Sequence, residues 1–273
     1  MKGETTRLIV TADDIGLHPA MTAGALRAHR EGIVTSCSVV ANGAALEDAV
    51  ARLRDAPALS VGIHLTLVGE PPVGDRADIG SLVDSSGRLH ASFLRFVPQY
   101  LAGAIRLSEV EREMRAQIET LLATGLSLQH ANGHQHLHLL PRIFELVVAL
   151  CREYRIGYVR TVSEKFQMSL RGASIAVLSS MGRRDRRNAA PLRTNDRTIG
   201  VTEAGHLDGA RLIELIDDVA GVTELVCHPA WWGDGEESPP YEWNYRWREE
   251  TEALCNPAVR EALEERQIAL VTP

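Results

Sequence analysis

The chain has 273 residues, of which 45% are hydrophobic and 24% are charged, a balance typical of a soluble globular protein. Its 29 Lys and Arg residues stand against 36 Asp and Glu residues, which gives a formal net charge of −7. The composition excludes a disordered chain, a collagen-like fibre and a long coiled coil. It also argues against a nucleic-acid partner, because an acidic protein lacks the surface that neutralises phosphates.

The first residues of the chain do not suggest export. The N-terminal residues pass from a short polar leader directly into an apolar segment, without the features of a signal peptide. The longest apolar runs fall short of the roughly 18 residues that a membrane span requires. The four cysteines show no zinc-ribbon, redox or disulfide-framework spacing. We therefore expect a cytoplasmic protein with no transmembrane segment.

Strand-like and helix-like segments alternate along the chain. In the first third, an apolar strand at 8–10 precedes a helix at 19–31, which has Pro19 in its first turn and Gly32 after its end. A β-branched strand at 34–43, an amphipathic helix at 45–56 and a strand at 60–69 follow. Residues 70–87 are rich in Gly, Pro and Asp, and their length suggests a functional loop.

The same alternation continues to the end of the chain. The expected strands are 126–138, 157–164, a sixth within 191–202, 223–232 and 267–273, and the expected helices are 108–124, 141–156, 208–220 and 257–266. Residues 165–190 break the pattern and contain the basic run RRDRR, so they resemble an insertion or a lid.

This βα alternation predicts an α/β fold with a mostly parallel sheet and helices outside it. About eight strands in a chain of this length fit a (β/α) barrel better than an open sheet. Because no linker-like segment interrupts the composition, we expect one domain over residues 1–273, with the barrel irregular or incomplete at its fifth and sixth strands.

Polar residues of catalytic type follow nearly every expected strand. Active sites of such barrels lie at the C-terminal ends of the strands. The residues at those ends are Asp13, Asp14, Asn42, His64, His130, His134, His136, His138, Arg160, Glu164, Asp196 and His228. One such residue would mean little, but seven strands with the same pattern predict an active site.

Asp13 and Asp14 are adjacent, so in an extended segment their side chains point to opposite sides. One could then bind a metal while the other acts as a general base. The alternative is that one of them caps the helix that follows.

Four of the ten histidines lie within residues 130–138. His134, His136 and His138 would share one side of an extended segment, whereas His134 and His138 would share a face of a helix. Histidine and aspartate are suitable Zn²⁺ ligands. Because Asn132 and Gly133 suggest a turn, we expect only one or two of these histidines to reach a metal. The others would support the ligands or bind substrate.

His228 follows an apolar strand and suits a general acid. The alternative is a structural histidine that stacks on Trp231 or Trp232. The tract that follows, residues 229–250, holds all four tryptophans, which suit stacking on sugar rings or packing at the barrel rim.

Four segments together resemble the YdjC-like carbohydrate deacetylases, which are metal-dependent members of the glycoside hydrolase/deacetylase barrel superfamily. The segments are LIVTADDIGLHPAMTAGALRAHREGIVTSCSVVANG, VGIHLTL, HANGHQHLHLLPRIF and ELVCHPA. Within the family, the stretches around the first and third segments look most like the branch associated with hopanoid biosynthesis.

The resemblance implies a role for each matching residue. It makes Asp14, His64 and His134 the ligands of one divalent metal, Asp13 the catalytic base and His228 the acid. His136 and His138 match other motif positions. The chain departs from the family at Asn132, where many members carry Asp, so a carboxylate that supports a histidine is missing there.

The implied reaction removes the N-acetyl group from an amino sugar, either an oligosaccharide or a hopanoid- or lipid-linked glycoside. Zn²⁺ suits two histidines and an aspartate, but the family is often described with Mg²⁺, so both stay open. One alternative is another metal-dependent hydrolase, a phosphoesterase or amidohydrolase, with a basic run that binds phosphate. The other is a non-catalytic carbohydrate- or metal-binding barrel.

The segments 70–90 and 165–190 and the aromatic tract should determine the substrate. The apolar residues of the two segments and their surroundings suit either a lipid-linked sugar or a homodimer contact. These residues are Phe93, Phe96, Phe166, Met168 and Met181.

Overall fold

The computed structural model describes residues 6–165 and 186–273. The expectation of an insertion or lid at 165–190 therefore falls largely outside the described residues. So do Phe166, Met168, Met181 and most of the basic run.

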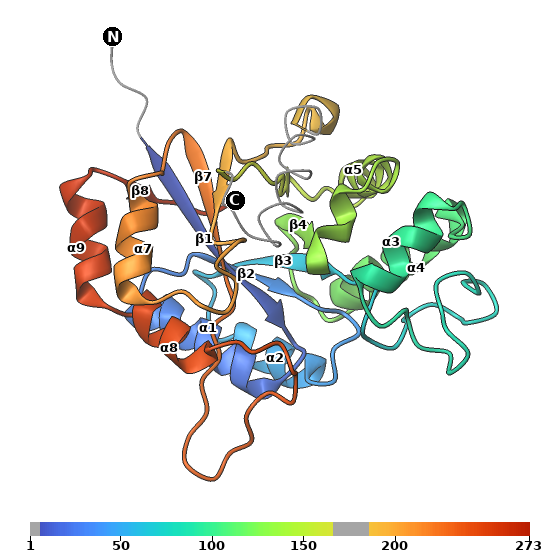
Figure 1. Cartoon of the computed structure of the whole chain (residues 1–273), viewed down its shortest axis with the longest axis horizontal. Helices are drawn as coiled ribbons and strands as arrows, with labels where there is room; N and C mark the ends of the chain where they lie inside the picture. Colours follow the sequence, from blue (N-terminus) through green and yellow to red (C-terminus); the bar gives the residue numbers. More distant parts are fainter. Residues whose placement is uncertain (1–5, 166–185) are drawn as a thin grey trace.

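Eight parallel strands form the sheet at the centre of the molecule (Figure 1). They are β1 (Arg7–Ile15), β2 (Ser36–Val39), β3 (Ser60–Leu65), β4 (His130–Gly133), β5 (Tyr158–Val159), β6 (Arg197–Ile199), β7 (Val222–Cys227) and β8 (Ala269–Leu270). Seven of them follow the order β5-β4-β3-β2-β1-β7-β6. Nearly every residue of β1, β2 and β3 is buried, as expected for parallel strands with both faces covered.

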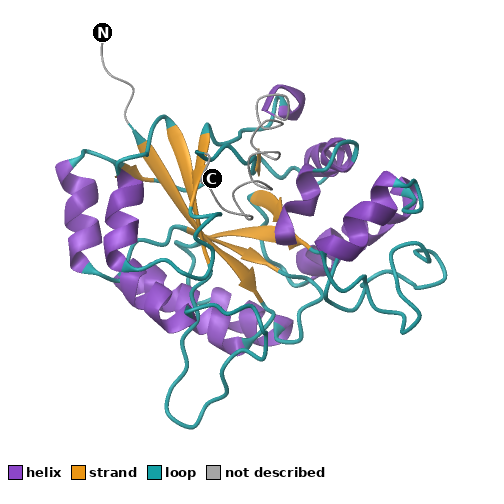
Figure 2. Ribbon diagram, viewed as in Figure 1, coloured by secondary structure: helices purple, strands orange, loops and turns teal. Residues whose placement is uncertain are grey.

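Helices surround the sheet on its outer side (Figure 2). They are α1 (Pro19–Glu31), α2 (Leu46–Leu53), α3 (Phe93–Leu101), α4 (Leu107–Ala123), α5 (Ile143–Glu153), α7 (Gly209–Ile216), α8 (Trp247–Leu254) and α9 (Pro257–Glu265), and a 3₁₀ segment, η1 (His134–Leu139), follows β4. None of the helices in the described ranges is both long and apolar enough to cross a bilayer.

The barrel is incomplete, as predicted, and its gap lies between β5 and β6. There, side chains replace part of the strand ladder. The Asn195 amide accepts the Thr161 N–H at 2.8 Å and donates to the Thr161 carbonyl at 2.7 Å. The Thr198 hydroxyl accepts the Ser163 N–H at 3.1 Å. These bonds satisfy backbone groups that a full pair of neighbouring strands would otherwise satisfy.

Three elements differ from the sequence-based expectation. The last strand, β8, does not stand between β7 and β1, which pair directly. Instead it pairs with the first residues of β1. Helices α3 and α8 were not predicted. Pro98 lies inside α3 and breaks the usual helical signal, while α8 begins at Trp247 inside the aromatic tract.

Helix α1 approaches the chain beyond β7 closely at Gly24. A β-carbon added at Gly24 would lie 2.5 Å from the Ala230 Cα atom, well inside van der Waals contact. Gly24 therefore sets how near α1 packs to the segment that follows His228.

We predict that Gly24→Ala destabilises the protein, although alanine favours helix by about 1 kcal/mol. Overpacking against a backbone typically costs about 1–3 kcal/mol, so the net free energy of unfolding should fall. Urea denaturation measures it. As a control, Ala23→Gly on the same helix should lose only helix propensity. An increase in stability for Gly24→Ala would show that α1 does not pack this closely.

Candidate active site

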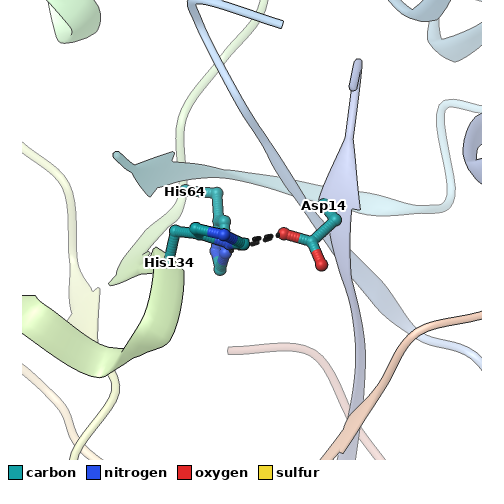
Figure 3. Close-up of side chains that lie close together, drawn as sticks. All are labelled: Asp14, His64 and His134. Carbon is teal, nitrogen blue, oxygen red and sulfur yellow. Dashed lines mark hydrogen bonds and ion pairs between the residues drawn. The ribbon is translucent and has the colours of Figure 1, made fainter. Parts of the chain in front are cut away.

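Asp14, His64 and His134 come together at the C-terminal ends of β1, β3 and β4. Figure 3 shows the three side chains pointing toward one another. The Asp14 Oδ1 atom lies 3.3 Å from His64 Nε2 and 2.9 Å from His134 Nδ1, and one ligand atom from each residue lies within 4.8 Å of the others. Asp14 and His64 are each only 2% exposed. The three residues thus form a compact, buried set of metal-ligating groups.

A break in the pleat of β1 aims both aspartates into the barrel. The register between β1 and β2 shifts between Ala12 and Ile15, and Asp14 has a φ of 66°, in the left-handed region that few residues other than glycine adopt. Such bulges re-aim side chains near active sites. The expectation that the two side chains point to opposite sides assumed an extended segment, and the backbone is not extended at Asp14. His64 lies near both carboxylates, with its Nδ1 atom 3.9 Å from Asp13 and its Nε2 atom 3.3 Å from Asp14.

Neither aspartate caps the helix that follows. The N-cap of α1 is His18, whose Nδ1 atom accepts the Ala20 N–H at 3.2 Å. The capping alternative for Asp13 and Asp14 is thus excluded, and both carboxylates face polar groups inside the barrel.

The donor set fits a divalent metal. His64 Nδ1 lies 2.7 Å from the Asn132 Oδ1 atom, an acceptor that fixes the proton on Nδ1 and leaves the Nε2 lone pair facing Asp14. Metal-binding histidines usually have such a partner. The Asn132 Nδ2 group also donates to Asp13 at 3.1 Å and to Ser38 at 2.7 Å. Asn132 therefore orients His64 through an amide oxygen, which carries no formal charge.

Asp13 is paired with a fully buried arginine. Arg160 Nη1 donates to Asp13 Oδ2 at 2.5 Å and Nη2 donates to Oδ1 at 2.9 Å, while Arg160 Nε donates to Glu224 at 2.8 Å. Burial alone would raise the pKa of Asp13, but the charge of Arg160, with that of His64, holds the pKa well below its ordinary value. Asp13 is therefore a carboxylate at neutral pH.

His228 lies near the second oxygen of Asp14, with its Nε2 atom 4.0 Å from Asp14 Oδ2. Its aromatic neighbour is Tyr245, at a ring-centroid distance of 5.2 Å, whereas the structural alternative placed it on Trp231 or Trp232. Burial lowers the pKa of His228, although Asp14 and Asp13 act in the opposite direction. The backbone N–H of His228 donates to Glu250 of α8 at 2.6 Å, and His228 Nδ1 lies 4.0 Å from the same Glu250 oxygen.

The other three histidines of residues 130–138 do not belong to the set formed by Asp14, His64 and His134. His130 packs over Gly62 inside the barrel and lies 3.3 Å from Ser38 Oγ, and burial lowers its pKa to about 3. His138 Nε2 lies 3.2 Å from the Arg160 carbonyl, and the His136 ring lies 6.3 Å from that of His138. Because η1 turns the chain directly after Gly133, only His134 of the four meets Asp14 and His64.

Four further candidate residues lie away from these three. Asn42 donates to the Pro71 carbonyl at 2.8 Å, and Glu164 accepts the Val201 and Thr202 N–H groups. Trp231 packs between Arg27 of α1 and Arg248 of α8, at 3.7 and 4.6 Å. Asp196 precedes β6 and accepts the Val222 N–H at 2.9 Å. Its expected place at a C-terminal strand end is therefore wrong, because the sixth strand begins only at Arg197.

Three acidic residues of this region were not predicted. Glu224 sits in the middle of apolar β7 and is fully buried, as is Glu250 on α8. Glu70 follows β3, and burial raises its pKa although the charge of Arg88 acts in the opposite direction. Only Glu224 carried a signal in the sequence, because it is a charged residue within an apolar strand. A buried charge needs a partner, so its position indicated a buried polar contact. Glu70 begins the segment 70–87, which was expected to be a functional loop, but nothing in that segment singles out its carboxylate. Nothing in the local sequence of Glu250 distinguishes it from a surface residue.

We predict that Glu250 makes the protein less stable at high pH. Burial raises its pKa from an ordinary value of 4.5 to about 8. Because the folded protein binds the Glu250 proton more tightly than the unfolded chain does, the protonated carboxyl group stabilises the folded state. This contribution is fully present below pH 4.5 and is lost as the pH rises through about 8. The Tm of the wild type should therefore fall between about pH 5 and about pH 9 more steeply than that of Glu250→Gln.

Glu252→Gln provides the control, because Glu252 is exposed on the same helix and should keep the wild-type pH dependence. Parallel Tm curves for the wild type and Glu250→Gln would show that Glu250 does not carry this effect.

The chain is similar to known proteins over nearly its whole length. The YdjC-like protein family matches residues 7–265. A relative from Geobacillus stearothermophilus, named carbohydrate deacetylase, is 31% identical over 97% of this chain and 95% of its own. A second relative of that name, from Brevibacillus brevis, is 31% identical over 82% of each chain.

A solved structure from Enterococcus faecalis V583, described as a proposed cellobiose-phosphate cleavage protein, has a TM-score of 0.73. It is 27% identical, and the match covers 98% of this chain and 97% of that one. The family predicted from the sequence is confirmed: the chain belongs to the YdjC-like protein family.

Proposed function

We propose that this protein is a metal-dependent carbohydrate deacetylase that hydrolyses the N-acetyl group of an amino sugar to a free amine and acetate. One observation carries the proposal: Asp14, His64 and His134 meet between the ionised Asp13 and His228. The name of the curated relatives, carbohydrate deacetylase, supports the class of substrate.

Asp14, His64 and His134 would hold the divalent ion. Two imidazoles and one carboxylate suit Zn²⁺, whereas Mg²⁺ prefers oxygen ligands. When bound, the ion polarises the acetamide carbonyl and acidifies water. Three protein ligands leave coordination positions open for these groups.

Asp13 would accept the proton from the attacking water. Arg160 and Asn132 hold both of its oxygens, so the carboxylate cannot rotate away from His64. A strongly paired carboxylate is a weak base, and its proton transfer requires a water that is already acidified. Asp13 would therefore depend on the neighbouring ion to acidify the water, although Asp13 itself is not a ligand of that ion.

His228 would donate a proton to the departing amine nitrogen. An amide needs this step because an amine anion is a poor leaving group. The His228 Nε2 atom lies 4.0 Å from Asp14 Oδ2, whereas His64 and His134 face Oδ1, and Glu250 accepts the His228 backbone N–H. A lowered pKa makes the protonated imidazole a stronger acid. The nitrogen leaves as the amine, the C–N bond breaks, and the acetyl carbon retains the oxygen from water as acetate.

The alternatives have less support. A two-metal phosphoesterase needs a second set of ligands, and residues 6–165 and 186–273 contain one candidate set. A non-catalytic binding protein would not need Asp13. The hopanoid branch, a lipid-linked sugar, a homodimer, a single domain and a cytoplasmic location stay predictions.

Two matched substitutions should separate the roles of the adjacent aspartates. Asp14→Asn should lower the metal content of the purified protein, because it removes the charged ligand while Asn tolerates the left-handed backbone. Asp13→Asn should retain the metal and lose at least about 100-fold in turnover, as expected for a lost general base. Metal analysis and acetate release from N-acetylated sugars measure the two effects.

His64→Ala should lose both metal and activity, because it removes a ligand. Full activity in this variant, or normal metal affinity in Asp14→Asn, would contradict the assignment. Wild-type protein treated with a chelator should regain acetate release when Zn²⁺ is restored.

A further inference from the structure

Residues 239–246, here called the aromatic strap, lie beside the candidate site. Tyr241, Trp243 and Tyr245 are half-buried and alternate with the exposed Glu242, Asn244 and Arg246. Asn244 has a φ of 56°, so the segment is not extended throughout, and the contacts between the rings are what place them together. Tyr241 stacks on Trp243 at 4.4 Å, and Trp243 contacts Tyr245 at 5.5 Å. The strap therefore presents a continuous aromatic surface.

This surface meets the candidate site at three points. The Trp243 ring lies 5.6 Å from the His134 ring, and the Tyr245 ring lies 5.2 Å from His228. The Tyr241 hydroxyl donates to Glu70 Oε1 at 3.5 Å. Residues from β7–α8 and from the β3 loop are thus brought together at the mouth of the barrel, next to a proposed ligand and the proposed acid.

Glu70 has a largely buried carboxylate with unused acceptor capacity. Its side chain is 13% exposed. Within residues 6–165 and 186–273 it makes one hydrogen bond, from Tyr241, and one ion pair, with Arg88 at 4.0 Å. A carboxylate can accept about four hydrogen bonds, so most of its capacity is open.

The backbone around Glu70 is fixed from both sides. The Glu70 carbonyl accepts the Leu89 N–H at 3.2 Å. On the other side, Asn42 bonds the Pro71 carbonyl, and buried Glu113 of α4 accepts the Val73 and Gly74 N–H groups at 3.0 and 2.8 Å. A group held in this way can recognise a ligand without the cost of ordering a loop.

We propose that Glu70 and Trp243 form the sugar-binding subsite, in which the ring stacks on Trp243 and ring hydroxyls donate to the Glu70 carboxylate. The ligand class is a pyranose with free hydroxyls beside its acetamido group. An aromatic face binds the apolar side of a sugar ring, and the oxygens of a carboxyl group accept hydroxyl hydrogen bonds. This inference rests on the proposed function, because it places the acetamido group at Asp14, His64 and His134.

The test compares Glu70→Gln with wild type in the metal-loaded protein on N-acetylglucosamine and on its 3-deoxy, 4-deoxy and 6-deoxy analogues. For the parent sugar we expect kcat/KM to fall about 10- to 100-fold, mainly through KM, because a hydrogen bond to a charged group is lost. On the analogue that lacks the contacted hydroxyl, the wild type and the variant should be nearly equal.

A merely structural role for Glu70 would reduce kcat/KM by the same factor on all four sugars, and that result would overturn the proposal. The matched control is Glu242→Gln, an exposed acid in the same strap, which should match wild type.

Trp243→Leu should weaken the binding of every sugar. The ratio of sugar turnover to 4-nitrophenyl acetate hydrolysis should fall in both subsite variants.

A binding experiment separates this proposal from the proposed function. Titration of the wild type with N-acetylglucosamine should change tryptophan fluorescence, and the change should be weaker in Glu70→Gln and Trp243→Leu. If the sugar binds in this manner but releases no acetate, the deacetylase proposal fails and the subsite stands. If acetate is released while Glu70→Gln and Trp243→Leu retain wild-type KM, the subsite is wrong and the deacetylase stands.

Discussion

The interior of this barrel depends on one buried cation. Arg160 is fully buried and lies between the carboxylates of Asp13 and Glu224. Removing a charge from water costs several kcal/mol, so each of the three groups requires the other two. Glu224 also accepts the hydroxyls of Thr11 and Tyr158. The network therefore joins three strands, β1, β7 and β5, through the interior of the barrel. In most barrels apolar side chains fill this interior.

This network links the architecture to the chemistry. Arg160 belongs to the segment after the short strand β5, where the barrel is incomplete, and its guanidinium is the charge that keeps Asp13 ionised. A buried charge left without its partner is strongly destabilising. Where the strand ladder ends, after β5, the ion pair between Arg160 and Asp13 thus connects the open edge of the barrel to the candidate site.

Much of the fold could be predicted because the apolar segments and helix signals are local. Pro19 and Gly32 marked α1 correctly, and the βα alternation indicated a parallel barrel with its irregularity at the fifth and sixth strands. The position of β8 could not be predicted, because pairing with the start of β1 depends on distant backbone groups. Helix α3 was missed because Pro98 obscures it, and α8 because its aromatic residues resemble a rim loop.

The candidate site was predictable where it follows strand ends. The strand ends indicated only that polar residues would gather there, and the resemblance to the family named Asp14, His64 and His134 as a set. The structure brings these three together at the ends of β1 and β3 and directly after β4. The orientation of Asp13 could not be predicted, since the bulge in β1 depends on its pairing with β2. Glu250 and Glu70 reach the site from a helix and a loop, so their part in it appears only in three dimensions. Asn132 looked like a defect in the motif, yet it joins His64 to Asp13.

The left-handed backbone at Asp14 has a consequence for how the sequence can change. A residue other than glycine in this conformation costs roughly 1–2 kcal/mol, and glycine would remove that cost. Glycine, however, carries no carboxylate for His64 and His134 to meet. Position 14 is therefore a place where stability and function oppose each other. Selection for thermal resistance alone would favour replacement of this residue, and a thermostable variant that has lost its site would be expected to carry the change here.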